Sequence, residues 1–459
     1  MTASGEATAL TLAERINALP IARIYGRLTK MTGLVLEASG CQLAVGDRCR
    51  IESRREQRCI EAEVVGFNDS VHFLMSLGNA SGLQPGDRVL TLGHDMAIPV
   101  GNHFLGRVIN GLAEPLDNHG SIRPDETIPL SSPPINPLHR KPITDPLDVG
   151  VRAINGLLSV GKGQRLGLMA GSGVGKSILL SMMTRNTTAD ITVVGMIGER
   201  GREVKEFIEH TLGPEGLART VVIAAPADES PVMRLRAALL CHRMAEYYRD
   251  RGQDVLLLMD SLTRYAQAQR EIALSVGEPP ATRGYTPSVF SQIPKLVERA
   301  GNGIEGSGSI TAFYTVLSEG DDLQDPVADA ARSILDGHIV LSRELADSGH
   351  YPAIDIESSI SRAMPQVADE TQQKAAQVFR HYYSRYHQFR DMMAIGAYQR
   401  GADPELDRAI QLYPLMQGYL KQGMYERIDH ASCIQQLYSL WQGGAAPAPT
   451  PGNNDTEVA

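Results

Sequence analysis

The stretch LGLMAGSGVGKS, residues 166–177, decides the fold of this 459-residue chain. Its first residues, Leu166 to Met169, form a short apolar run typical of a buried strand, and a helical pattern begins at Lys176. A glycine-rich loop lies between them, which lets consecutive backbone N–H groups face the oxygens of a phosphate at the N-terminus of the helix. The stretch therefore predicts a phosphate-binding loop in an α/β domain.

The residues of this loop have predicted parts in binding ATP. Lys176 neutralises the outer phosphates, and the Ser177 hydroxyl holds Mg²⁺. The strict pattern begins with glycine where this chain has Ala170, a mild departure because the residues that cradle phosphate follow it. A glycine-rich turn without a ligand is the alternative, and GKS after a buried strand argues against it. The predicted nucleotide-binding residues of the loop are Ala170, Gly171, Ser172, Gly173, Val174, Gly175, Lys176 and Ser177.

Two carboxylates follow other apolar strands and are expected at the same edge of the sheet. Asp260 ends the run DVLLLMD, where we expect it to hold Mg²⁺ through water. A helix N-cap is the alternative for a carboxylate in that position. Glu199 follows the strand Ile191 to Ile197 and can polarise the attacking water. A salt bridge to Arg200 or Arg202 is an equally weighted alternative for Glu199.

A second cation is needed near the charge that develops during hydrolysis. Arg362, in the run SSISR, lies between the last predicted strand of the sheet and a helical region. An arginine finger raises the rate of phosphoryl transfer roughly 10³- to 10⁵-fold. An ordinary surface arginine is the default alternative at such a position.

The rest of the chain divides around this core. Alternating apolar and polar residues, punctuated by turns at Gly46-Asp47 and Pro85-Gly86-Asp87, predict a small β-barrel over residues 23–95. Eight prolines between Pro115 and Pro146 predict an extended connector, residues 96–150. Apolar runs that alternate with helical stretches predict a largely parallel sheet over residues 151–364. The runs are Leu166 to Met169, Ile191 to Ile197, Val221 to Ala225, Val255 to Met259, Ile310 to Leu317 and His338 to Leu341.

Helical repeats such as Glu370 to Met393 and Glu405 to Gln422 predict a helical C-terminal domain over residues 365–442. The tail, residues 443–459, has almost no large apolar side chains and is expected to be disordered. Residues 1–22 contain a short amphipathic pattern. A helix that docks a partner and a helix packed on its own domain are equally weighted there.

Composition excludes several classes of function. The formal net charge of -9 disfavours a nucleic-acid partner or a membrane-surface role. The five cysteines form no CxxC pair and predict free thiols in a reducing compartment. The chain has no apolar run of about 20 residues and no secretory signal, so the expected location is cytoplasmic.

Four motifs together resemble the type III protein-export ATPases, which are relatives of the rotary ATP synthase β subunit. They are AGSGVGKS (170–177), GERGREV (198–204), VLLLMDSLTRYAQAQREIALSVGEPPATRGYTPSVF (255–290) and EGDDLQDPVADAARSILDGHIVLSR (319–343). The likeness runs from about Arg23 to Gln442. Three further stretches most resemble the flagellar branch of this family: YGRLTKMTGLVLEASG (25–40), VVIAAPADESP (221–231) and ERAGNGIEGSGSITAFYT (298–315).

The resemblance implies a fold and a set of roles. The fold is a RecA-like P-loop core with an N-terminal β-barrel and a C-terminal helical domain, assembled as a homohexamer. Glu199 activates water with Arg200 beside it, and Arg362 is a finger that reaches a neighbour's nucleotide. Tyr351 stacks on adenine, whereas a buried packing tyrosine is the alternative without the family.

The resemblance also implies a cellular location and a set of partners. These are a stator-like regulator at the N-terminus, a coiled-coil central stalk, an export-gate membrane protein, and the export chaperones with their flagellar subunits. The expected location is cytoplasmic and peripheral to the inner-membrane export apparatus. The function implied is ATP hydrolysis that releases chaperones and promotes export of flagellar subunits.

Other functions remain open at the level of sequence. A virulence-type secretion ATPase or the catalytic subunit of a proton-translocating synthase would use the same chemistry. A RecA-like nucleic-acid motor is disfavoured by the acidity, and a non-enzymatic ring subunit is disfavoured by Glu199 and Arg362. Because one chain type carries both of these residues, the sequence favours a ring of identical subunits.

Overall fold

The computed structural model describes residues 25–53, 55, 57–93, 97–171, 173–317 and 325–442. These form two compact units: one comprises the chain up to residue 96 with residues 272–278, and the other comprises residues 97–271 and 279 onward. The predicted N-terminal helix and C-terminal tail lie outside the described residues. Within the described ranges, no helix combines the length and apolar character needed to cross a membrane.

The first unit is built on a closed six-stranded antiparallel barrel. Its strands are β1 (Tyr25–Thr32), β2 (Val35–Ser39), β3 (Arg48–Ser53), β4 (Arg58–Asn68), β5 (Val71–Ser76) and β6 (Arg88–Gly93), in the order β1-β2-β5-β4-β3-β6. Inward-facing apolar side chains such as Leu36, Ile51 and Leu74 fill its core. The barrel follows from the alternation of apolar and polar residues, since one residue in two must face inward.

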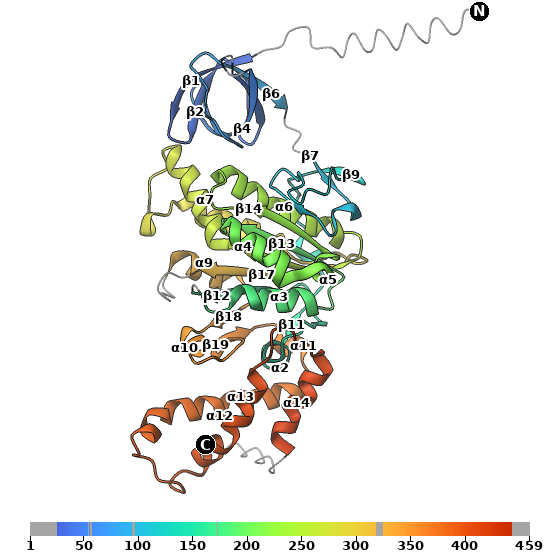
Figure 1. Cartoon of the computed structure of the whole chain (residues 1–459), viewed down its shortest axis with the longest axis vertical. Helices are drawn as coiled ribbons and strands as arrows, with labels where there is room; N and C mark the ends of the chain where they lie inside the picture. Colours follow the sequence, from blue (N-terminus) through green and yellow to red (C-terminus); the bar gives the residue numbers. More distant parts are fainter. Residues whose placement is uncertain are drawn as a thin grey trace, which may run out of the picture. The chain divides into compact units, whose positions relative to one another are not determined.

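The second unit is built on a nine-stranded sheet that is mostly parallel (Figure 1). Its order is β19-β18-β12-β17-β15-β13-β14-β8, with the short β16 paired to β17 outside this path. Six strands coincide, within a residue at either end, with the apolar runs that predict them. These are β12 (Arg165–Ala170), β13 (Ile191–Ile197), β14 (Thr220–Ala225), β15 (Asp254–Asp260), β17 (Ser309–Leu317) and β18 (Gly337–Leu341). The predicted α/β fold is confirmed.

Three strands of this sheet carry no clear signal in the sequence. β8 (Val108–Ile109) and β16 (Gly301–Asn302) are two residues long. β19 (Ile354–Ser361) is an edge strand, antiparallel to β18, and several of its side chains are exposed. Because β19 is only partly buried, it lacks the continuous apolar run of its parallel neighbours.

Helices connect the strands and cover the sheet. The longest of those within the sheet region, α6 (Pro231–Arg249), packs along β13, β14, β15 and β17, and 16 of its 19 residues are buried. α3 (Lys176–Asn186) follows β12, and α7 (Leu262–Ser275) follows β15. The other described helices of this region are α2 (Arg152–Leu157), α4 (Gly201–Glu206), a π-helical turn (Phe207–Leu212), α5 (Gly213–Leu217), a 3-10 turn (Thr282–Gly284), α8 (Pro287–Val297), α9 (Pro326–Ile334) and α10 (Arg343–Asp347).

The proline-rich segment before the sheet is attached to the second unit along much of its length. β7 (Ala97–Val100) pairs with β9 (Glu126–Pro129), and β10 (Pro146–Leu147) pairs with β11 (Val160–Gly161). The buried Tyr248 hydroxyl on α6 donates a hydrogen bond of 3.0 Å to the carbonyl of Gly101. This segment therefore has an extended backbone, as its prolines require, and lies against the core.

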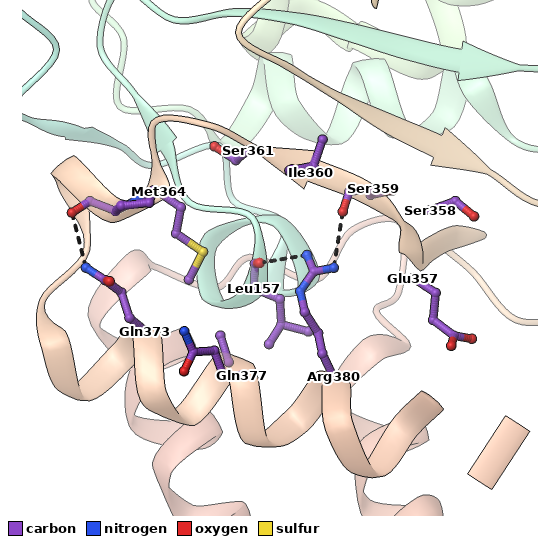
Figure 2. Close-up of a pocket in the computed structure, with 12 residues that line it drawn as sticks. Leu157, Glu357, Ser358, Ser359, Ile360, Ser361, Met364, Gln373, Gln377 and Arg380 are labelled. Carbon is purple, nitrogen blue, oxygen red and sulfur yellow. Dashed lines mark hydrogen bonds between the residues drawn. The ribbon is translucent and has the colours of Figure 1, made fainter. Parts of the chain in front are cut away.

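Three long helices form the C-terminal region: α12 (Glu370–Ala394), α13 (Pro404–Leu420) and α14 (His430–Gln442), preceded by the short α11 (Met364–Val367). Arg380 of α12 joins this region to the sheet. Its guanidinium donates to the carbonyls of Ser359 on β19 and of Leu157 at the end of α2 (Figure 2). It also donates to the carbonyl of Ile356 on β19. A cavity of about 390 Å³ lies beside these contacts. The C-terminal helices are thus hydrogen-bonded directly to the edge strand of the nine-stranded sheet.

Candidate active site

The glycine-rich loop connects β12 to α3, as its sequence predicts. Gly173 and Gly175 have φ angles of 77° and 88°, in the left-handed region that side chains with a Cβ rarely adopt. Gly175 is the N-cap residue of α3, which begins at Lys176. The loop therefore ends at the positive end of a helix dipole, where an anion is stabilised. Ser172 lies outside the described residues.

Lys176 meets both predicted carboxylates at the carboxyl edge of the sheet. Its Nζ lies 2.7 Å from Oδ1 of Asp260 and 3.5 Å from Oε1 of Glu199. The two carboxylates come together because β13, which leads to Glu199, pairs in parallel with β15, which ends at Asp260. Both are buried, with 8% of Glu199 and 3% of Asp260 exposed. Three residues that are far apart in the sequence thus share one small polar site.

Burial and neighbouring charges shift the pKa values of Glu199 and Lys176. Burial, and after it the negative charge of Asp260, raises the pKa of Glu199 to about 7. Burial disfavours the ammonium of Lys176, but the charges of Asp260 and Glu199 outweigh it and raise the pKa of Lys176. Lys176 is therefore charged, whereas Glu199 changes its protonation state near neutral pH.

The two arginines that follow Glu199 form ion pairs with other carboxylates. Arg200, 85% exposed in its side chain, lies 3.8 Å from Glu203, and Arg202 pairs with Glu206 at 2.7 Å. The cation that contacts Glu199 is Lys176. The salt bridge to a neighbouring arginine, the structural alternative for Glu199, is not the arrangement that the protein adopts.

Arg362 lies at the opposite edge of the sheet, the amino edge, where the parallel strands begin. It directly follows β19, whose last residue Ser361 pairs with Gly337 at the start of β18. Its backbone N–H donates to the carbonyl of Asp336, and its guanidinium donates to the carbonyl of Leu335. The phosphate loop follows the other end of β12, a parallel neighbour of β18. At about 3.3 Å per residue, the length of a six-residue strand, roughly 20 Å, separates the two edges.

Tyr351 lies beside the phosphate loop. A Cβ built on Gly175 would lie 3.3 Å from Cε1 of the Tyr351 ring, so the ring contacts the loop. The residue is 43% exposed, which excludes the fully buried packing role that is its alternative. Its carbonyl accepts a hydrogen bond of 3.0 Å from the backbone of Gln422, just after α13. The C-terminal region thus contacts the segment that carries Tyr351.

One polar contact in the site was missed by reasoning from sequence. Thr315, on β17, is fully buried, and its hydroxyl donates a hydrogen bond of 2.6 Å to Oδ1 of Asp260. The available signal was a threonine near the end of a mostly apolar strand that neighbours the phosphate loop. Only the order of the strands, in which β17 lies between β12 and β15, places that threonine beside Asp260.

The residues present fit a nucleotide with a divalent cation. The loop has no side chain at Gly173 and Gly175, the two positions with left-handed backbone, so its backbone is open to a phosphate. The Lys176 ammonium carries a positive charge, and the exposed Ser177 lies in the first turn of α3. Asp260 adds a buried carboxylate directly beside the lysine. Oxygen ligands of this kind are those that Mg²⁺ prefers.

Comparison with known proteins agrees with this chemistry. The model of the ATP synthase alpha/beta family, nucleotide-binding domain, matches residues 150–361. That of the type III secretion EscN ATPase C-terminal domain matches residues 368–439. The flagellum-specific ATP synthase of Pseudomonas aeruginosa is 60% identical over 425 residues, covering 92% of this chain and 94% of the relative. The flagellum-specific ATP synthase of Salmonella typhimurium is 59% identical over 430 residues, covering 91% and 94%.

Relatives from virulence systems are less similar. The type 3 secretion system ATPase of Xanthomonas euvesicatoria is 44% identical over 430 residues, covering 94% of this chain and 97% of the relative. The structure of the assembled ATPase EscN from enteropathogenic E. coli superposes with a TM-score of 0.84 at 40% identity, covering 90% of this chain and 99% of that one. The difference in identity favours the flagellar branch over the virulence branch.

The fold and the phosphate loop define a P-loop ATPase, as predicted. The chain belongs to the flagellum-specific ATP synthases, the flagellar branch of the type III protein-export ATPases within the ATP synthase alpha/beta family. The predicted family, fold class and enzyme class are therefore confirmed.

Proposed function

We propose that this export ATPase hydrolyses MgATP at sites shared between identical subunits of a ring. The observation that carries the proposal is the division of residues between the two edges of the sheet. Lys176, Glu199 and Asp260 converge at the carboxyl edge, and Arg362 lies at the other edge. Within the described residues, the phosphate site of one chain therefore lies far from Arg362 of the same chain, which favours an arginine supplied by a neighbouring copy.

Each residue at the carboxyl edge has a proposed task. When ATP binds, the Lys176 ammonium leaves the carboxylates of Glu199 and Asp260 and pairs with the outer phosphates. The backbone amides of residues 170–177 hold the remaining phosphate oxygens. Glu199, released from Lys176, orients and polarises the attacking water. The Ser177 hydroxyl and, through water, Asp260 would hold Mg²⁺, which would supply positive charge beside the phosphates. Tyr351 stacks on the adenine ring, while Arg200 remains beside the site.

The ring supplies the missing cation. Arg362 of one subunit stabilises the charge that develops on the nucleotide of its neighbour, which requires a homo-oligomer. The likeness to EscN, whose structure is that of an assembled ATPase, supports a ring, and we propose the homohexamer of the family. In a synthase with alternating catalytic and non-catalytic chains these parts are divided, so the presence of both in one chain favours the export ATPase.

The proposed partners follow from the family. A central coiled-coil stalk is supported by the complex of EscN with its central stalk EscO, which superposes with a TM-score of 0.83 at 40% identity. Residues 1–22 are proposed to bind a stator-like regulator. The export gate, the chaperones and the flagellar subunits are the other partners, with the enzyme cytoplasmic and peripheral to the inner-membrane export apparatus.

The experiment that tests this function is ATPase activity across size-resolved fractions at several protein concentrations. Activity per subunit is expected to rise steeply where the ring forms, with no second large subunit present. Equal activity in the monomer fraction would contradict a site shared between subunits. Stimulation by nucleic acid would instead favour a nucleic-acid motor.

A further inference from the structure

Thr315 makes the shortest hydrogen bond to the carboxylate proposed to bind Mg²⁺ through water. Its hydroxyl lies 2.6 Å from Oδ1 of Asp260, and Lys176 Nζ lies 2.7 Å from the same oxygen. A carboxylate oxygen accepts, so the threonine is the donor. Hydrogen bonds with an ionised acceptor are short and roughly twice as strong as those between neutral groups.

The position of Thr315 follows from the order of the strands. β17 lies between β12 and β15, and Thr315 pairs with Leu168 of β12. On the other side Tyr314 pairs with Met259, so Thr315 is the residue next to Asp260. Its exposed fraction is 0%, so solvent does not reach the hydroxyl to substitute for it. The strand therefore fixes the donor with little freedom.

Nucleotide binding is expected to affect the two donors to Oδ1 of Asp260, Lys176 and Thr315, differently. Lys176 belongs to the phosphate loop, so its ammonium is drawn toward the phosphates and away from Asp260. Among the described residues, the second hydrogen-bond partner of the Thr315 hydroxyl is the carbonyl of Met259 at 3.4 Å, on β15 and not on the phosphate loop. In a site loaded with nucleotide, Thr315 would remain as a donor to Oδ1, and Asp260 would hold the cation through water with its other oxygen, Oδ2.

We propose that Thr315 is a positioning residue, which holds one oxygen of Asp260 so that the other is presented to the Mg²⁺ of MgATP. The inference rests on the proposed role of Asp260. Hydrogen-bond partners that orient metal ligands typically change metal affinity or activity 10- to 100-fold when they are removed.

Two substitutions of Thr315 separate orientation from packing. Thr315→Val keeps the branched shape and removes the donor, whereas Thr315→Ser keeps the donor and removes a methyl group. Thr192→Val is the matched control, because Thr192 is equally buried on β13 and its hydroxyl has no hydrogen-bond partner. The measurements are the Mg²⁺ concentration for half-maximal ATPase activity and the binding of a fluorescent ADP analogue with Mg²⁺ or with a chelator.

If Thr315 orients the carboxylate of Asp260, Thr315→Val should raise the Mg²⁺ concentration for half-maximal activity about 10- to 100-fold. This role also predicts weaker Mg²⁺-dependent nucleotide binding, unchanged binding in chelator, and near-normal behaviour of Thr315→Ser and Thr192→Val. A packing role predicts the reverse order, with Thr315→Ser the more damaged. That order, or a Thr315→Val enzyme with normal Mg²⁺ dependence, would overturn the inference.

Asp260→Asn distinguishes failure of this inference from failure of the proposed function. If Asp260→Asn alters the Mg²⁺ dependence and Thr315→Val does not, only the role of Thr315 is wrong. If neither variant alters the dependence, the assignment of Asp260 to the metal is wrong, and the inference about Thr315 is overturned with it.

Discussion

The two edges of the central sheet differ in what they can do alone. At the carboxyl edge, a lysine and two carboxylates from three different strand ends lie within hydrogen-bonding or ion-pairing distance of one another. At the amino edge, Arg362 is exposed, and within the described part of the chain it donates hydrogen bonds to the backbone carbonyls of Leu335 and Asp336. We propose that the first edge binds phosphate, and the second edge carries an arginine that lies about a strand's length away from it. This difference is the structural reason to expect catalysis between copies.

The largest expected effect is at the carboxyl edge. Lys176→Ala should leave no measurable hydrolysis and should weaken nucleotide binding, because it removes the charge that replaces the water shell of the outer phosphates. It also leaves Glu199 and Asp260 without their shared cation. Steady-state ATPase assays and equilibrium nucleotide binding check both parts. Normal binding in this variant would contradict the assignment of the loop.

The next effect concerns the amino edge. Arg362→Ala should lower kcat roughly 10³- to 10⁵-fold, as loss of an arginine finger does, while nucleotide still binds. Arg202→Ala is the matched control, since Arg202 is 86% exposed in its side chain and pairs with Glu206 at the surface. It should change kcat less than about twofold. Equal losses in the two variants would make Arg362 an ordinary surface arginine.

A smaller effect is expected at Glu199. Glu199→Gln should lower kcat roughly 10²- to 10⁴-fold, the usual contribution of a group that accepts a proton from water. Nucleotide affinity should be kept, because the amide is nearly the same size and Lys176 is still present. Single-turnover kinetics with separately measured binding distinguishes the two steps. Hydrolysis at the normal rate would show that another group activates water.

Much of this comparison could be predicted from the sequence. The strand ends at Ala170, Ile197 and Asp260 follow from apolar runs, and parallel strands bring such ends to one edge. The partner of Glu199 could not be predicted, because Lys176 approaches it only through the fold. β19 was missed because a partly buried edge strand lacks a continuous apolar run. Thr315 was missed because the neighbour of a threonine on a strand depends on the order of the strands.

The smallest expected effect is a dependence of stability on pH. The pKa of Glu199 is about 7 in the folded, nucleotide-free protein, above its ordinary value of 4.5, so folding favours the protonated form. This stabilisation is complete below about pH 4.5 and is lost as the pH rises through about 7, roughly 3 kcal/mol at most. The Tm of the wild type minus that of Glu199→Gln should therefore fall by a few degrees between pH 5 and pH 8. A constant difference would contradict the buried, raised carboxyl.

The central claim, that one active site uses both edges from different copies, is tested most directly by mixing two inactive variants. Glu199→Gln chains keep the finger, and Arg362→Ala chains keep the water-activating group. Carrying different tags, they are mixed in equal amounts, and only rings that contain both tags are assayed. Random mixing should restore up to about a quarter of the wild-type activity, because one interface in four combines an intact Glu199 with an intact Arg362. Mixed rings that stay as inactive as either parent would contradict the account.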